Sequence, residues 1–184
     1  RILIMGIVIS NIQVVSIGPR TATITWETSE SIASELRFGT STSYPYLLSG
    51  GTGTSHQVAL SSWWPDTTCH FKVGYSTYGY SDDMTFTTLR MTYDIQVVSV
   101  TATAATISWK TYESVYSEVQ YGTSTSYGNT VSGGYSTSHQ VTITGLVSGT
   151  TYHFRVGHSS YGYSTDRILI MGIVISNIQV VSIG

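Results

Sequence analysis

The first eighteen residues of the chain, RILIMGIVISNIQVVSIG, return without a change as residues 167–184. A second, degenerate repeat lies between these two copies. The pentapeptide IQVVS begins at residues 12, 95 and 178, so its two steps along the chain are equal (95 minus 12, and 178 minus 95). Repeats at a fixed spacing are the mark of an array of one structural unit. We therefore expect a series of like domains that forms part of a polymer.

The two copies of this unit align without a gap, and about half of the aligned positions are identical. Each unit is close to the lower end of common domain sizes. We expect an apolar strand in residues 1–7 that completes a neighbouring domain, domain 1 in residues 8–90, domain 2 in residues 91–172, and the start of the next repeat in residues 173–184.

Composition indicates a secreted or cell-surface β protein. Only 10% of the residues are charged and the net charge is −2, a field too weak to imply a nucleic-acid partner or an anionic membrane. The apolar stretch at residues 1–9 is too short to span a bilayer as a helix, and its repetition argues against a cleaved signal peptide. The single cysteine, Cys69, cannot form an internal disulfide, and its place in a strand predicts a buried thiol.

Apolar residues alternate with polar ones in several short runs bounded by Gly, Ser and Thr, the pattern of half-buried strands. No run has a sustained helical period. Seven short strands per repeat predict an all-β fold of two tandem β-sandwiches. The expected inward positions in domain 1, each with a counterpart one repeat further along the chain, are Ala22, Ile24 and Trp26, then Ser34, Leu36 and Phe38, then Val58 and Leu60, and finally Cys69, Phe71 and Val73.

Four segments of domain 2 carry a family resemblance: ATISWKT at residues 105–111, SEVQYGTS at 117–124, HQVTITGL at 139–146 and GTTYHFRVG at 149–157. Together they resemble a fibronectin type III domain, an immunoglobulin-like sandwich, and are most similar to the variety found as the amino-terminal domain of purple acid phosphatases. The resemblance implies that Tyr152 is a tyrosine-corner residue whose hydroxyl bonds back to the backbone. In domain 1, Cys69 replaces this tyrosine and Trp-Trp-Pro occupies residues 63–65, so its corner must be packed differently.

No catalytic residue, metal site or cofactor is expected. The metal-binding catalytic domain of the phosphatases has no counterpart in the chain, and no nucleophile elbow, phosphate loop or Cys-x-x-Cys pair is present. Four of the five histidines form two repeat-equivalent pairs, His56 with His139 and His70 with His153, and are interpreted as ordinary strand residues rather than metal ligands. The acidic pair at residues 82–83 is assigned to a turn rather than to a calcium site.

Two loops are rich in tyrosine, YSTYGY at residues 75–80 and HSSYGY at residues 158–163. Tyrosine supplies rigid amphipathic contact area, which suits binding to carbohydrate or protein; loops packed on their own domain are the other interpretation, and the two stay open. O-linked glycans on surface Ser and Thr also stay open, whereas no N-glycosylation motif is present. The possible contact residues are Tyr75, Tyr78, Tyr80, Tyr161 and Tyr163.

The copied segment provides the strongest indication of function. Residues 84–89 should form the last strand of domain 1, with Phe86 inward and Thr85 and Thr87 outward. In register, domain 2 offers residues 167–172, which are apolar on both faces, and such an edge strand is a liability unless another surface covers it. The predicted assembly strand comprises Ile2, Leu3, Ile4, Met5, Ile7 and Ile9 and, in the second copy, Ile168, Leu169, Ile170 and Met171.

These features predict a structural subunit of an extracellular filament or surface fibre whose partner is itself, in a head-to-tail homopolymer. The subunits are joined either by strand complementation or as a covalent tandem array. A carbohydrate- or protein-binding accessory module of a secreted protein is the alternative, and an enzyme is not expected.

Overall fold

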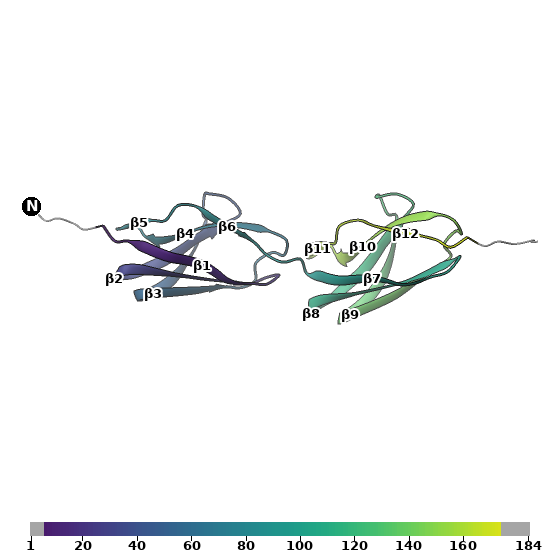
Figure 1. Ribbon diagram of the computed structural model, residues 1–184, viewed down its shortest axis with the longest axis horizontal. Coiled ribbons are helices and arrows are strands. Elements are labelled where there is room, and N and C mark those ends of the chain that lie inside the picture. The colour runs from purple at the N-terminus through teal and green to yellow at the C-terminus, as the bar shows by residue number, and fades with distance from the viewer. Residues whose placement is uncertain (1–5, 174–184) are drawn as a thin grey trace, which may run out of the picture. The chain divides into compact units, whose positions relative to one another are not determined.

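The computed structural model describes residues 6–173, all of it β-strand, turn or irregular chain (Figure 1). The chain divides into two compact units: domain 1 ends at Arg90 and domain 2 begins at Met91. No helix long and apolar enough to cross a membrane occurs in this part of the chain.

Within residues 6–173 each domain has six strands, so the expectation of seven short strands per repeat is wrong in number. The strands predicted around residues 22–26 and 34–38 are the two halves of one long strand, β2, because the residues between them include no Gly or Pro to end it. In domain 1 the strands are β1 (Ile9–Ile17), β2 (Ala22–Gly39), β3 (Tyr46–Leu60), β4 (Thr68–Tyr75), β5 (Gly79–Tyr80) and β6 (Met84–Thr87). In domain 2 they are β7 (Thr92–Val100), β8 (Ala104–Gly122), β9 (Asn129–Thr144), β10 (Thr151–His158), β11 (Gly162–Tyr163) and β12 (Arg167–Ile170).

A bend in β2 folds the strands of domain 1 into two layers. β1 pairs only with the first half of β2, whereas β4 pairs only with the second half. β3 follows both halves, and its register with β2 shifts between Glu27 and Ile32, where the strand bends. Domain 2 repeats this arrangement with β7 to β12. The predicted fold class, two tandem β-sandwiches, is confirmed.

The core of each domain lies between its two layers and uses the predicted inward positions. In domain 1, Ile24 and Trp26 from the first half of β2 are buried together with Leu36 from the second half and with Phe71 and Val73 from β4. Their counterparts fill the core of domain 2 (Ile107, Trp109, Val119, Phe154 and Val156).

A tryptophan bridges the bend in each domain. The indole Nε1 of Trp26 donates a hydrogen bond to Oγ of Ser34 at 2.8 Å, and that hydroxyl donates to the carbonyl oxygen of Gly74 at 3.2 Å. Domain 2 has the same 2.8 Å bond from Trp109 to Ser117. Since Trp26 lies before the bend and Ser34 after it, this side-chain bond joins the two layers.

A histidine lies against the same indole. The rings of Trp26 and His56 are stacked with centroids 5.3 Å apart. Nδ1 of His56 is 3.3 Å from the carbonyl oxygen of Gly50, and Nε2 is 3.0 Å from Oγ1 of Thr28. His139 is placed in the same way in domain 2. The two histidines are therefore buried structural residues that help to fix the bend, a role that their interpretation as ordinary strand residues did not include.

The corners of the two domains differ, as predicted. In domain 2 the Tyr152 hydroxyl accepts a hydrogen bond from the backbone N–H of Val147 at 3.2 Å, which is the expected tyrosine corner. In domain 1 the buried Trp63 fills this region and packs against Phe38, with ring centroids 5.4 Å apart. Cys69 is a free, buried cysteine, and burial raises the pKa of its thiol to about 11.

Replacing Ser34 with Ala should destabilise domain 1 by about 1–3 kcal/mol, because the buried indole N–H of Trp26 then lacks an acceptor. Urea unfolding followed by circular dichroism measures the change, and Ser117→Ala is the matched test in domain 2. In the double variant Trp26→Phe/Ser34→Ala the loss should be smaller than the sum of the two single losses. Additive losses would show that the bond does not couple the two layers.

Candidate assembly surface

The closing strand of domain 2 is formed by the copied segment. β12 pairs with β10 so that Leu169 lies opposite Tyr152, as Phe86 of β6 lies opposite Cys69 in domain 1. Leu169 and Met171 are both buried in the core of domain 2. Residues 167–171 are therefore part of the fold of this domain.

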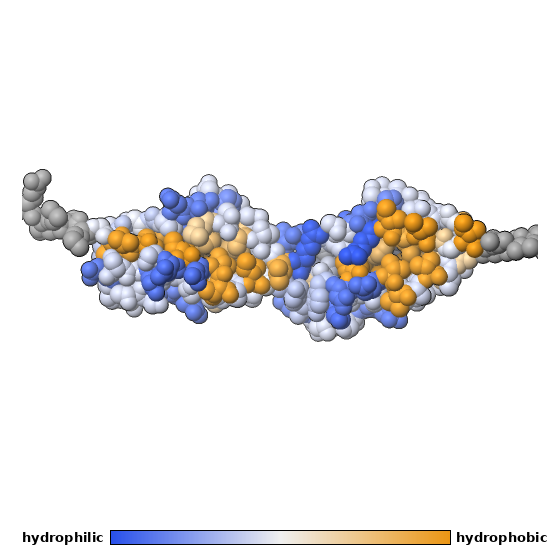
Figure 2. All heavy atoms as spheres, in the orientation of Figure 1, coloured by the Kyte–Doolittle hydropathy of each residue, from blue (hydrophilic) through white to orange (hydrophobic). Residues whose placement is uncertain are grey.

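The outward face of β12 is apolar. Ile168 and Ile170 have 59% and 69% of their surface exposed, and Ile173, just beyond the strand, has 80%. We call these three residues the isoleucine edge; the space-filling view shows hydrophobic residues gathered over this part of domain 2 (Figure 2). The equivalent positions in domain 1 are Thr85, Thr87 and Arg90, and Thr87 shares a hydrogen bond with Thr68. The sandwich does not require isoleucine at these positions, since domain 1 closes with polar residues there.

Strand β7 adds exposed valines beside this edge. Two hydrogen bonds link β7 and the residue that follows it with the segment that carries the isoleucine edge. The Arg167 guanidinium donates to the Ile95 carbonyl oxygen of β7 at 3.2 Å, and the Gly172 N–H donates to the carbonyl oxygen of Thr101, just after β7, at 3.2 Å. Val97, Val98 and Val100 of β7 are all exposed. The sequence pattern did not predict a role for these valines or for Ile173, the latter because it lies in the segment assigned to the next repeat.

The first copy of the predicted assembly strand is only partly described. Ile2, Leu3, Ile4 and Met5 lie outside the described residues. Ile9 is the first residue of β1, opposite Thr28, and it packs against the core of domain 1, so its side chain serves that domain.

Most of the tyrosines named as possible contacts are engaged within their own domains. Tyr161 is buried, and its hydroxyl donates to the carbonyl oxygen of Tyr116 at 3.0 Å. Tyr80 and Tyr163 lie under guanidinium groups, with Arg155 4.2 Å from the ring of Tyr163. Tyr163 is also bonded to Glu118, and the pKa of its phenol is raised to about 12, chiefly by burial.

The tyrosine loop of domain 1 is more open. The rings of Tyr75 and Tyr78 lie 6.5 Å apart, and Tyr78 is exposed. A cavity of about 510 Å³ is lined by Tyr78 and Tyr80, which were predicted as contact residues, and by Ile7 and Ile9, which were predicted as part of the assembly strand. Ile12 and Met84 also line it. In domain 2 the counterpart of Met84 is Arg167, whose guanidinium is bonded to the backbone of β7.

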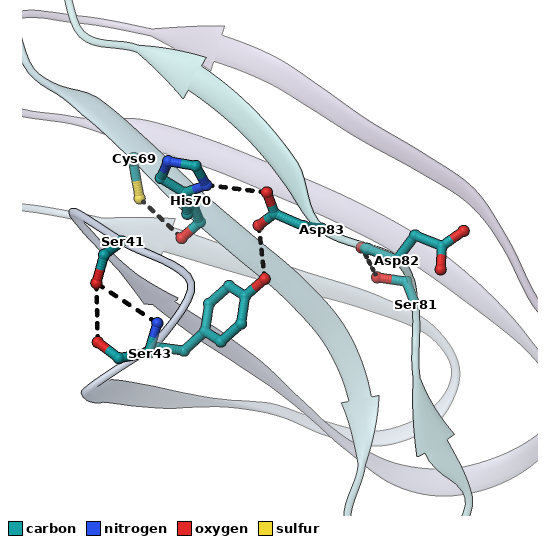
Figure 3. A network of polar contacts seen from close by, with 8 residues as sticks. Ser41, Ser43, Cys69, His70, Ser81, Asp82 and Asp83 are labelled. Carbon is teal, nitrogen blue, oxygen red and sulfur yellow. Dashed lines mark hydrogen bonds and ion pairs between the residues drawn. The ribbon is translucent and has the colours of Figure 1, made fainter.

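A His–Asp–Tyr network occurs in both domains. Asp83 accepts a hydrogen bond from the Tyr44 hydroxyl at 2.6 Å and pairs with Nδ1 of His70 at 2.9 Å (Figure 3). In domain 2, Asp166 contacts Tyr127 at 3.0 Å and His153 at 2.7 Å. These bonds hold the segment that precedes β6 or β12 to its neighbours. No group of three His, Cys, Asp or Glu side chains that could hold a metal ion occurs among residues 6–173.

Residues 92–168 match the family model of the purple acid phosphatase N-terminal domain. The match runs from the start of β7 into β12, which confirms the family resemblance of domain 2, and the catalytic domain of those enzymes has no counterpart in the chain. None of the curated proteins is significantly similar to the chain in sequence.

Solved structures of similar fold include a two-domain fibronectin type III segment of chicken tenascin, with 16% identity and a TM-score of 0.44 over 89% of this chain and 98% of that one. The FN1–FN3 domains of chicken CNTN1 have 15% identity and a TM-score of 0.38, over 89% and 66% of the two chains. The sensor domain of the anti-sigma factor RsgI4 from Pseudobacteroides cellulosolvens has 19% identity and a TM-score of 0.39, over 47% and 97%.

Replacing Leu169 with Ala should destabilise domain 2 by about 2–5 kcal/mol, since it leaves a cavity in the core between β10 and the opposite layer. Domain 1 should keep its stability, because its closing strand is β6. Hydrogen exchange of the two domains in the full chain measures both effects. Protection in domain 2 equal to that of the unchanged protein would show that β12 is not its closing strand.

The stability of both domains should fall in acid. Tyr44 and His70 hold the pKa of Asp83 below its ordinary value of 3.8, and His153 and Tyr127 do the same for Asp166. A carboxyl group whose pKa is lowered on folding stabilises the fold above its unfolded pKa, and this contribution is lost as the pH falls through the folded pKa. Thermal unfolding from pH 7 to pH 2 should show a smaller loss for Asp83→Asn/Asp166→Asn than for the unchanged protein. Asp82→Asn is the control. An equal loss of stability in all three proteins would show that Asp83 and Asp166 do not cause the loss in acid.

Proposed function

We propose that the protein is a structural subunit of an extracellular filament, in which pairs of fibronectin type III-like domains repeat head-to-tail. The observation that carries this proposal is the closing strand of domain 2. It is an unchanged copy of residues 1–4, and it presents the isoleucine edge to solvent.

Two kinds of connection are compatible with this proposal. In a covalent array, a peptide bond joins Asp166 to Arg167, so the closing strand of domain 2 belongs to the same chain. Each two-domain period then continues directly into the next. In strand complementation, the protomer comprises residues 1–166 and a neighbouring subunit donates residues 1–7, whose main-chain hydrogen bonds with β10 provide the affinity. The mass of fully denatured filaments separates the two, because an array gives very large chains and complementation gives single protomers.

The isoleucine edge then serves as the contact between neighbouring units. Each isoleucine side chain withdrawn from water stabilises a contact by about 1.5–3 kcal/mol. A contact that uses an edge at one end of the subunit and a different surface of the next is heterologous, and such contacts grow into filaments rather than closed dimers.

An extracellular location agrees with the composition. Charged residues make up only 10% of the chain, and its one cysteine is buried and unpaired, so the fold depends on no disulfide. The exposed Ser and Thr side chains provide sites for O-linked glycans. We assign no catalytic role, because the family match is to the N-terminal domain of the phosphatases and the repeated His–Asp–Tyr networks are bonded internally.

The alternative function is a carbohydrate- or protein-binding accessory module. Of its five predicted contact tyrosines, Tyr161 is buried, and Tyr80 and Tyr163 lie under arginine side chains. This leaves Tyr75 and Tyr78 of domain 1 as the open part of the predicted contact surface. The alternative also leaves the unchanged copy of residues 1–18 without explanation.

Substitution of two residues of the isoleucine edge, Ile168 and Ile170, by the residues that domain 1 carries should abolish filaments. The variant is Ile168→Thr and Ile170→Thr, with the same change at their copies Ile2 and Ile4. It should keep both domains folded, because Thr85 and Thr87 occupy these positions in domain 1. Electron microscopy and sedimentation measure filament length, and circular dichroism measures the fold.

The matched control replaces the same four isoleucines with Val, which keeps the surface apolar, and its filaments should persist. Filaments of ordinary length in the Thr variant would overturn the role of this edge. Assembly by protein that lacks residues 1–9 and 167–184 would overturn strand completion as well.

A further inference from the structure

Exposed tyrosines gather around the bend of β8 in domain 2. Tyr93 and Tyr112 lie before the bend with ring centroids 4.5 Å apart, and Tyr116 and Tyr135 lie after it at 5.1 Å. All four are exposed, and Tyr116 and Tyr135 have 64% and 63% of their surface in solvent. The equivalent residues of domain 1 are Ser10, Ser29, Ala33 and Thr52. The fold forms without aromatic rings at these positions, so their presence in domain 2 calls for another explanation.

A small groove lies next to the first of these pairs. It has a volume of about 210 Å³ and is lined by Asp94, Ser108, Lys110, Ser138 and Gln140 together with Trp109 and His139. Tyr93 lies opposite Lys110 in the β7–β8 register. Tyr112 is two residues beyond Lys110 along β8 and therefore lies on the same face. The Tyr93–Tyr112 pair thus lies on the same face as Lys110, beside the groove and outside its lining.

The groove offers fixed hydrogen-bonding groups of both kinds. Nζ of Lys110 is 2.8 Å from Oδ2 of Asp94, and the side chains of both residues are about half exposed. A lysine held against a carboxylate keeps two further N–H donors, and the carboxylate keeps free acceptor positions. The hydroxyl and amide groups of Ser108, Ser138 and Gln140 add more of each kind. Because the two charges compensate each other, the groove has no preference for a charged ligand.

We propose that this groove binds a neutral glycan chain, with a sugar ring stacked on Tyr93 and Tyr112 and its hydroxyl groups bonded by Asp94, Lys110 and Gln140. A pyranose ring combines an apolar C–H face with a rim of hydroxyls that both donate and accept. A tyrosine pair beside a row of mixed polar side chains complements both parts of such a ring. The site is independent of the isoleucine edge, and it gives the filament subunit a ligand in addition to itself.

A proline-rich peptide is the other ligand class that aromatic grooves accept. Such a peptide stacks its rings on aromatic side chains but presents few hydrogen-bonding groups, since proline has no backbone N–H. Five polar side chains in a groove of this size favour the glycan.

Binding is tested with the full chain and three neutral probes, the linear hexasaccharides of glucose, mannose and N-acetylglucosamine, by isothermal titration calorimetry and by NMR. At least one of them should bind with a dissociation constant of about 10 mM or lower, the weak affinity of a shallow open site. The variant Tyr93→Ser/Tyr112→Ser carries the domain 1 residues at both positions, and its affinity should fall about tenfold or more. Lys110→Glu, again the domain 1 residue, should also weaken binding.

Tyr135→Thr, again the domain 1 residue, removes an exposed tyrosine outside the groove and is the matched control, which should bind as the unchanged protein does. Three results would overturn the proposal: no binding of any hexasaccharide, equal affinity in Tyr93→Ser/Tyr112→Ser, or binding of decaproline in place of the glycans. Filament assembly of the tyrosine variants should be unaffected, so failure of this inference is distinguishable from failure of the filament.

Discussion

The hydrogen bond between Trp26 and Ser34, with its copy between Trp109 and Ser117, is the interaction on which both domains depend. A strand as long as β2 does not make a sandwich unless something fixes the place where it turns from one layer to the other. The indole of Trp26 reaches across this bend. The stacked histidine covers one part of its ring, and the backbone of Gly50 approaches another. A Cβ at Gly50 would lie 2.5 Å from Cζ2 of Trp26, so a side chain there would displace the ring. This packed cluster therefore joins the two layers at the bend.

On that shared frame the two domains differ at the surface. Domain 1 closes with a polar outward face at Thr85 and Thr87 and has small side chains around its bend. Domain 2 closes with isoleucine and places tyrosine at the same bend positions. Since the buried positions are nearly the same, the core does not dictate these surface differences. In the proposed filament, they are the positions at which domain 2 makes its contacts.

Patterns with a period of two predicted most of the core, because a half-buried strand shows its inward residues directly. Phe86 and Leu169 were found in this way, and the register between repeats then placed Ile168 and Ile170 outward. His56 alternates in step with Val58 and Leu60, so the period-two pattern indicated that its side chain is buried. The pattern did not indicate that the ring stacks on Trp26. The continuity of β2 follows from the absence of Gly and Pro between its two halves, a local signal that the prediction of two separate strands missed. The burial of Tyr161 depends on a carbonyl group far away in the sequence, that of Tyr116, and is not visible in local sequence.

In each domain the residues just after the first strand are bonded to the residues just after the last strand. In domain 2 the Gly172 N–H bonds to Thr101 and Arg167 reaches Ile95, and in domain 1 the Leu89 N–H bonds to Gly18 at 3.1 Å. A chain pulled at its two ends therefore loads the joint between these two segments of each domain, together with the core contacts of Leu169 and Met171 beside it in domain 2. In the proposed filament, this joint would carry the load through each domain.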